Sequence, residues 1–422
     1  MHRATIPMTI TAALLLFLLT CPLLPGHADI SESDDITAVR KRAEAGDAAA
    51  QYRLGFLYAV GKGVAKDDQQ AVAWYAKAAE QGYAEAQAYL GRKYYYGEGV
   101  PLDYAQAASW FTRAAEQGHS GSQVVLGMMY ASGKGVAHDE KQAVAWYTRA
   151  AEQGQGKAQY LLAEMYAAGK GAARDIGQAE AWYNRAAMQG EAEAQFKLGW
   201  LYARGNGVLQ DNKKALKYFN QAAEQGHAEA QFNLAVMYDE GIGVIKDHQQ
   251  AINWYTKAAA RGQVLAQYNL GIKYSLGEGV IEDPEQAVRW FTRAARKGYV
   301  KAQYNLGAMY DKGEGVARDY AKAISWYTMA AEQGDEKAQS SLAVMYGEGK
   351  GVERDDKLAY AWSSLSASSG NRRAARNRDI LEERLSPREL SEAKEMATRL
   401  QAQIERKKNA PEPDPAAVDN SQ

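Results

Sequence analysis

The stretch that decides the fold is residues 83–118, which read YAEAQAYLGRKYYYGEGVPLDYAQAASWFTRAAEQG. The recurrent residues of its first half are separated by offsets of one, four, five and eight, which is the spacing of one face of an α-helix. They are Ala86, Gln87, Leu90, Gly91 and Tyr94. Its second half carries another set at helical spacing, namely Ala107, Trp110, Phe111, Ala114 and Ala115. The alternation expected of a strand is absent, so the stretch predicts two helices.

Turn residues separate these two helices. Gly97 and Gly99 end the first one, because glycine accepts the left-handed conformation of a helix stop. Asp103 is an N-cap for the second helix, and Gln106 is its predicted capping-box partner. Gly118 ends the second helix. The stretch therefore predicts a helix, a glycine-rich loop, a second helix and a tight turn.

This unit is repeated along the chain with a period of 36 residues. The glutamine of its first helix returns as Gln51, Gln87, Gln123, Gln159, Gln195, Gln231, Gln267, Gln303 and Gln339. The tryptophan of its second helix returns at the same step from Trp74 to Trp362, with Tyr218 in one place. Nine copies occupy residues 47–370, and a period of this length indicates a solenoid or a propeller. Helical spacing selects an all-α solenoid of stacked helix-turn-helix repeats, with core tryptophans such as Trp254.

The composition excludes several other classes of protein. The 422 residues include 50 Lys and Arg against 51 Asp and Glu, which argues against a basic nucleic-acid binder. The single cysteine excludes a disulfide within the chain. Glycine is abundant, with 39 residues, because each repeat uses three of them in turns.

The N-terminus predicts export. Arg3 precedes a short apolar run, and Gly26-His27-Ala28 provides small residues at a cleavage site, so residues 1–28 resemble a bacterial signal peptide. The predicted protein is periplasmic or secreted, with no stable membrane span after cleavage. A retained anchor is one alternative, although the apolar run is shorter than the roughly 20 residues that cross a bilayer. Acylation at Cys21 is another, although its neighbours Thr20 and Pro22 fit poorly.

The ends of the repeat array are predicted to be caps. Residues 29–46 form a linker and a charged helix that resembles the second helix of a repeat. Residues 371–408 form a helical cap, in which Ser386 and Glu389 make a capping box. Its last helix has an apolar stripe that is expected to cover the final repeat, made of Leu390, Ala393, Met396, Ala397 and Leu400. Residues 409–422 contain three prolines and no aromatic residue, which is typical of a disordered tail.

The repeat resembles the SEL-1-like repeat, a relative of the tetratricopeptide repeat. The resemblance rests on Ala-x-Ala-Gln-Tyr-x-Leu-Gly-x-x-Tyr, Gly-x-Gly-Val-x-x-Asp and Gln-Ala-x-x-Trp-Tyr-x-Lys-Ala-Ala-x-Gln-Gly, and it covers residues 47–370. It implies a right-handed superhelix of helix pairs that acts as a scaffold or adaptor. A cysteine-rich branch of the family is linked to β-lactam binding or hydrolysis. This chain lacks the cysteines of that branch, which argues against the activity.

No catalytic, cofactor or metal site is predicted. The glycine-rich loops lack the third glycine of a dinucleotide fingerprint and the lysine of a phosphate-binding loop. The recurrent aspartates lie one repeat apart, as helix caps do. His119, His138, His227 and His248 have no second ligand at short spacing. A serine triad is not excluded by sequence, because such triads assemble in space.

The remaining candidate is a binding surface on the first helix of each repeat. Positions 85, 89, 92 and 96 lie opposite the recurrent face on a helical wheel. The resemblance places this varied stripe in a concave groove. The alternative is that the stripe is merely unconstrained surface. The predicted partner-binding residues are Tyr89, Arg92, Tyr96, Lys197, Trp200, Arg204, Asn233, Asn269, Ile272 and Asn305.

Three observations favour recognition over unconstrained surface. Asn233, Asn269 and Asn305 share one stripe position, and a row of amides can bond the backbone of an extended peptide. Ile272 lies in an apolar patch around Asn269, with Leu265 and Leu276. Trp200 is the one tryptophan outside the repeat register, and Lys197 and Arg204 flank it as in an interface anchor.

The sequence thus predicts an exported, non-enzymatic scaffold that binds a protein or peptide in the groove, and no nucleic acid. Two other classes stay open at this point. One is a cell-wall-directed enzyme resembling a β-lactam hydrolase, suggested by the cysteine-rich relatives. The other is a carbohydrate-binding module, suggested by tyrosines such as Tyr89, Tyr95 and Tyr96.

Overall fold

The computed structural model describes residues 36–409, and all regular structure in that range is helical. The predicted signal peptide (residues 1–28), residues 29–35 of the predicted linker and residues 410–422 of the predicted tail at 409–422 lie outside this range. The first helices are α2 (Ile36–Glu44), α3 (Ala48–Val60), α4 (Asp68–Glu80), α5 (Ala84–Tyr96), α6 (Tyr104–Glu116), α7 (Ser120–Ser132), α8 (Glu140–Glu152), α9 (Gly156–Ala168), α10 (Ile176–Met188), α11 (Ala192–Arg204) and α12 (Asn212–Glu224). They are followed by α13 (Ala228–Glu240), α14 (His248–Ala260), α15 (Val264–Leu276), α16 (Pro284–Arg296), α17 (Val300–Lys312), α18 (Tyr320–Ala331), α19 (Glu336–Glu348), α20 (Asp356–Ser368), α21 (Arg372–Arg384) and α22 (Pro387–Asn409).

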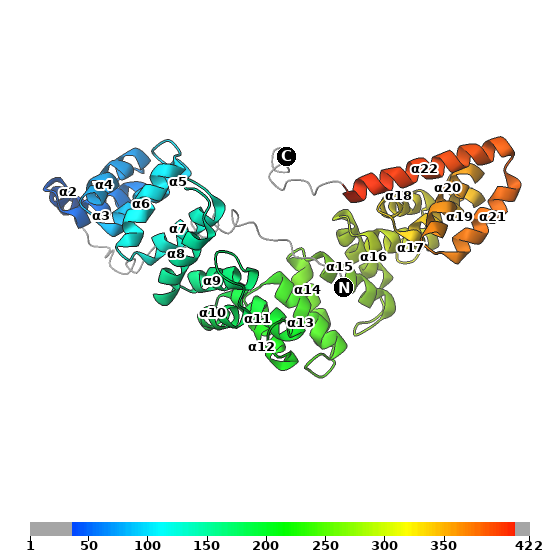
Figure 1. Cartoon of the computed structure of the whole chain (residues 1–422). Coiled ribbons are helices and arrows are strands. Elements are labelled where there is room, and N and C mark those ends of the chain that lie inside the picture. The colour runs from blue at the N-terminus through cyan, green and yellow to red at the C-terminus, as the bar shows by residue number, and fades with distance from the viewer. Residues whose placement is uncertain (1–35, 410–422) are drawn as a thin grey trace. The chain divides into compact units, whose positions relative to one another are not determined.

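The chain divides into two compact units, and the boundary lies in α12 between Ala222 and Ala223. We call the odd-numbered helices α3 to α19 the A helices and the even-numbered helices α4 to α20 the B helices. Within each unit an A helix packs on the B helix that follows it, and that B helix packs on the next A helix (Figure 1). Each unit is therefore an α-solenoid of stacked helix pairs, as the sequence predicts.

The predicted helix stops and N-caps are confirmed, but the capping box differs. Gly97 ends α5 with a left-handed φ of 72°. The Asp103 carboxylate accepts the backbone N–H groups of Ala105 and Gln106 at the start of α6. The backbone N–H of Asp103 itself donates to the Tyr94 carbonyl at 3.0 Å. In a capping box the Gln106 side chain would accept a hydrogen bond from this Asp103 N–H, so no capping box forms here. The bond to Tyr94 instead ties the loop to the preceding A helix.

In eight of the nine B helices the core aromatic residue is the one after the tryptophan position, whereas α20 carries Ser363 there and buries Trp362 itself. Tyr75, Phe111, Tyr147, Phe219, Tyr255 and Phe291 are almost fully buried. Five of them face a glycine of the A helix, and Tyr255 packs with Ala235 at the same position; a Cβ added to Gly271 would lie 2.5 Å from the Phe291 ring. The prediction that Trp254 is a core residue is only partly right, since its ring is half-buried.

Six tryptophans of the B helices, of which Trp146 is buried and the others are half-buried, are covered by a cation. A lysine or arginine three residues later lies 3.8–4.5 Å from the ring centre in six repeats. The pairs are Trp74–Lys77, Trp110–Arg113, Trp146–Arg149, Trp182–Arg185, Trp254–Lys257 and Trp290–Arg293. Cation–π contact and a long aliphatic stem together shield the exposed part of each indole.

The predicted caps cover both ends of the described helices. In α2, Val39 and Ala43 are buried against Leu54 and Leu57 of α3. Ser386 and Glu389 form the predicted capping box of α22, with the Ser386 N–H donating to the Glu389 carboxylate at 3.0 Å. The apolar stripe of α22 lies along α18 and α20, and Ile404 extends it beyond the predicted Leu400 (Figure 1). The helix reaches Asn409, which the sequence assigns to the tail.

The recurrent glutamines are buried links between consecutive repeats. Each donates from Nε2 to the backbone carbonyl eight residues earlier, at 3.0–3.2 Å. In five repeats the glutamine Oε1 also accepts a hydrogen bond from a second glutamine 30 residues later, as Gln303 does from Gln333 at 2.8 Å. The second glutamine is replaced by Arg261, Lys297 and Ser369 in three repeats. In those repeats Oε1 of Gln231, Gln267 and Gln339 is buried without a partner among the described residues.

Replacing Lys297 with glutamine is therefore expected to stabilise the protein. The new side chain would donate to the buried Oε1 of Gln267 in place of the exposed bond from Lys297 Nζ to the Gly262 carbonyl, for a net gain of about 1 kcal/mol. Urea unfolding followed by circular dichroism measures the change. The reverse substitution, Gln333→Lys, removes the bond to Gln303 and should cost a similar amount. Equal urea midpoints for Lys297→Gln and the parent chain would contradict the conclusion that the unpartnered Gln267 oxygen costs stability.

Candidate partner-binding surface

The predicted stripe is present in unit 2 as one continuous face of adjacent A helices. We call this face the A-helix surface; its residues are Asn233 and Val236 on α13, Asn269, Ile272 and Leu276 on α15, and Asn305 and Ala308 on α17. The Lys273 ammonium of α15 reaches the Asp239 carboxylate of α13 at 2.6 Å, so these two helices lie side by side. The Tyr268 side chain of α15 likewise lies close to the Asn305 side chain of α17.

The three asparagines of this surface are half-buried, and the amides of two of them are already engaged within the chain. Asn233 donates to the Glu229 carbonyl of its own helix at 2.7 Å, and Asn269 donates to the Tyr255 hydroxyl at 3.1 Å. Burial raises the pKa of Tyr268, and the nearby Asn305 amide opposes that shift. The expectation of a free amide ladder is therefore too simple. Each amide has two N–H donors and two acceptor sites, so one internal bond leaves capacity for a ligand.

The apolar part of the surface surrounds the central asparagine. Ile272 is half-buried and packs against the core cluster that contains Phe291 and Met309. Leu276 at the end of α15 is 61% exposed. Leu265 is half-buried, so only part of the predicted patch is accessible. The surface thus combines a polar row with a partly exposed aliphatic row.

In unit 1 the structure corrects the prediction for Tyr89. Its side chain is buried, with ring centres of Tyr52 and Tyr75 at 5.6 and 5.5 Å, so it belongs to the core rather than to an open groove. Tyr95 is also buried. Tyr96 is half-buried, and burial raises its pKa to about 12. These tyrosines therefore give no support to a carbohydrate-binding module.

Arg92 lies beside these tyrosines and is half-buried. Its Nε and the Tyr96 hydroxyl are buried without hydrogen-bond partners among the described residues. The predicted residues Arg92 and Tyr96 are thus near the surface, but little of either is open to a partner.

Trp200 is also less exposed than the sequence predicts. Its ring lies edge-on to Phe196 and Phe219, with centres at 6.4 and 6.0 Å, and the Arg204 guanidinium covers it at 4.3 Å. Lys197 pairs with Glu164 of α9 at 3.0 Å. The side chain of Trp200 therefore helps to pack α11 against α12, because Phe219 is a core residue of α12.

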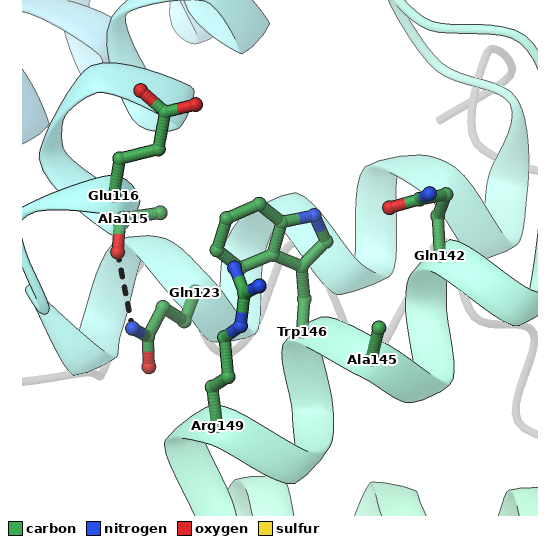
Figure 2. A pocket seen from close by; sticks show the side chains of 7 residues that line it. All are labelled: Ala115, Glu116, Gln123, Gln142, Ala145, Trp146 and Arg149. Carbon is green, nitrogen blue, oxygen red and sulfur yellow. Dashed lines mark hydrogen bonds between the residues drawn. The ribbon is translucent and has the colours of Figure 1, made fainter.

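A surface hollow of about 520 Å³ lies in unit 1, where α6, α7 and α8 meet. Figure 2 shows Trp146 between Arg149 and Gln142, with Gln123 donating to the Ala115 carbonyl. Sequence reasoning missed this hollow, although a tryptophan followed three residues later by a cation is a readable signal. The tryptophan–cation pair that lines the hollow recurs in six repeats. We therefore attribute the hollow to the packing of the repeat rather than to a specialised binding site.

The described residues hold one mainly buried charged cluster in unit 2. The Lys273 ammonium lies 2.6 Å from Asp239 and 2.8 Å from Glu278, and His248 Nδ1 lies 2.7 Å from the same Asp239 oxygen. Within residues 36–409, no group of three or more His, Cys, Asp or Glu side chains is arranged to hold a metal ion. The same range contains no helix that is long and apolar enough to cross a membrane.

Comparison with known proteins identifies the repeat. The Sel1 repeat matches the chain nine times in succession, at residues 48–83, 84–119, 120–155, 156–191, 192–227, 228–263, 264–299, 300–335 and 336–371. No curated protein shows a significant match.

Two solved structures are similar over most of the chain. A protective antigen of uropathogenic Escherichia coli, described as having an SLR fold, is 32% identical with a TM-score of 0.53, and the match covers 90% of this chain and 98% of that one. A Sel1 repeat protein from Oxalobacter formigenes is 36% identical with a TM-score of 0.59, covering 74% of this chain and 90% of that one. With nine consecutive matches and the helix pairs described above, this chain belongs to the Sel1 repeat family.

Proposed function

We propose that this chain is an exported, non-enzymatic scaffold, periplasmic or secreted, that binds a protein or peptide partner on the A-helix surface of unit 2. The observation that carries the proposal is the row of Asn233, Asn269 and Asn305, each half-buried and repeated in register on three successive A helices. Its spare amide groups can bond a peptide backbone, and Ile272 and Leu276 can receive apolar side chains. Export is proposed from the sequence of residues 1–28.

The test uses a variant whose new residues already occur at the same positions of other repeats. Lys197 corresponds to Asn269, and Glu164 corresponds to Ile272, so the double variant Asn269→Lys and Ile272→Glu should fold. We expect a partner that co-purifies with the mature protein from envelope extract to bind this variant at least about tenfold more weakly, a loss of about 1.4 kcal/mol. Titration of the isolated partner measures the change.

The matched control is Asn253→Lys on the exposed face of α14, where another repeat carries Lys217. This control should bind like the parent chain. Equal binding by the double variant would refute the A-helix surface as the site. Hydrolysis of nitrocefin by the purified mature protein above the buffer rate would refute the non-enzymatic part of the proposal.

A further inference from the structure

Three consecutive repeats expose a large aliphatic side chain at one position of the glycine-rich loop. Leu209, Ile245 and Ile281 are 89%, 88% and 91% exposed. The other repeats have small, cyclic or charged residues there, namely Ala65, Pro101, Ala137, Ala173, Ala317 and Glu353. The fold therefore does not require an aliphatic residue at this position. Ile245 and Ile281 belong to unit 2, where Ile242 is also exposed.

The two loops of unit 2 that carry these isoleucines are held in place at their ends. The backbone N–H of Asp247 donates to the Tyr238 carbonyl at 2.8 Å, and that of Asp283 donates to the Tyr274 carbonyl at 2.8 Å. Both aspartates also cap the helices that follow. Ile245 and Ile281 are thus presented by fixed loops, which reduces the entropy lost when a partner binds.

The two loops are also neighbours. A Cβ added to Gly279 in the second loop would lie 2.5 Å from Cβ of His248, the residue that directly follows the first loop. Only a residue without a side chain permits this approach. Ile245 and Ile281 consequently lie on adjacent loops along one edge of unit 2.

The surroundings of this pair are acidic. Residues 240–248 and 276–285 contain Glu240, Asp247, Glu282, Asp283 and Glu285, and also Glu278, which is paired with Lys273. Lys246 and His248 are the only basic residues in these two segments. A negative rim attracts a cationic partner and repels the anionic headgroups of a bilayer surface.

We infer that Ile245 and Ile281 form the apolar centre of a second docking surface, the loop edge of unit 2, for a basic amphipathic helix of another protein. The apolar face of such a helix would cover the two isoleucines, and its lysines or arginines would face Glu240, Glu282 and Glu285. Ile245 and Ile281 are not residues of the A-helix surface, so the inference does not depend on the function proposed above.

The test measures binding of a synthetic amphipathic Leu/Lys helix to the mature protein by fluorescence anisotropy. The variant is Ile245→Ala with Ile281→Ala, which installs the residue found at Ala137, Ala173 and Ala317 and should leave the melting temperature unchanged. We expect the variant to bind at least about tenfold more weakly and added salt to weaken binding to the parent chain. A Leu/Glu helix of the same length should not bind. The A-helix surface variant Asn269→Lys with Ile272→Glu should bind the Leu/Lys helix normally.

Several results would overturn the inference. One is equal affinity of the parent chain and the double alanine variant for the Leu/Lys helix, or no binding by either. Another is co-sedimentation with phosphatidylcholine–phosphatidylglycerol vesicles that the double variant loses, which would make a lipid surface the occupant. A dimer in light scattering that the double variant converts to a monomer would instead make a second copy the occupant.

Discussion

Replacing Phe291 with alanine is expected to lower the free energy of unfolding by about 3–5 kcal/mol. The ring is 2% exposed and is surrounded by Val288, Leu306 and Met309. It also covers Gly271, whose missing side chain makes room for it. Removing the ring leaves a cavity that neither helix of the pair can fill by a small movement.

The matched control for this variant is the neighbouring substitution Trp290→Ala. Trp290 is half-buried beneath Arg293, whose guanidinium lies 4.5 Å from the ring centre. Its loss should cost less than half as much, because less apolar surface returns to water. Urea unfolding followed by circular dichroism compares the two variants. If Trp290→Ala proves the more damaging, the tryptophan is the core residue after all.

Replacing Lys273 with methionine is expected to destabilise unit 2 by about 2–3 kcal/mol. Seven other repeats carry leucine or methionine here, so the new side chain fits. The cost comes from Asp239, whose side chain is only 10% exposed and would lose the ammonium 2.6 Å away. His248 Nδ1 would remain 2.7 Å from Asp239 Oδ1.

Lys93→Met is the control for this prediction. Lys93 occupies the same position in α5, but its partners Asp68 and Glu98 are 29% and 42% exposed. Water can solvate these carboxylates after the substitution, so little stability should be lost. Adding Asp239→Ala to Lys273→Met removes the stranded carboxylate and should restore the parental midpoint. Failure of this rescue would show that Asp239 is not the source of the cost.

The charged cluster of Lys273, Asp239 and Glu278 makes the stability of the parent chain depend on pH, and Lys273→Met should lack this dependence. The hydrogen bond and charge of Lys273 lower the pKa of Glu278, so this carboxylate stabilises the fold above its unfolded pKa of about 4.3 and loses that effect as pH falls further. Burial disfavours the Lys273 charge, but Asp239 and Glu278 outweigh it and raise the pKa of Lys273. Its contribution is therefore complete below its unfolded pKa of about 10.4 and is lost as pH rises through the higher folded value. The parent and Lys273→Met should differ most between these limits.

The local structure of the chain could be predicted because short-range chemistry decides it. Helical spacing, the Asp103 cap and the Gly97 stop act within a few residues, and each recurs nine times or nearly so. The confirmed capping box of Ser386 and Glu389 is a further case. One helix pair cannot bury its apolar face alone. A fixed 36-residue period therefore predicts that neighbouring pairs stack on one another.

The candidate site was predicted less well because burial depends on neighbouring repeats. Tyr89 lies on the correct stripe of its helix, yet Tyr52 and Tyr75 enclose it. Asn269 also lies on the stripe, yet its amide N–H donates a hydrogen bond to the Tyr255 hydroxyl of the preceding helix. A helical wheel gives the direction of a side chain and contains no information about what another helix places beside it.

The sequence by itself determined the helices, their caps and stops, the repeat and the solenoid class, because these depend on residue types at fixed short spacing. Only the tertiary structure decided that Phe291 rather than Trp290 fills the core, since two neighbouring helical positions point about 100° apart and the facing Gly271 admits only one of them. It also decided that Ile245 and Ile281 lie on adjacent loops and face solvent, because residues 36 apart meet only when one repeat packs on the next.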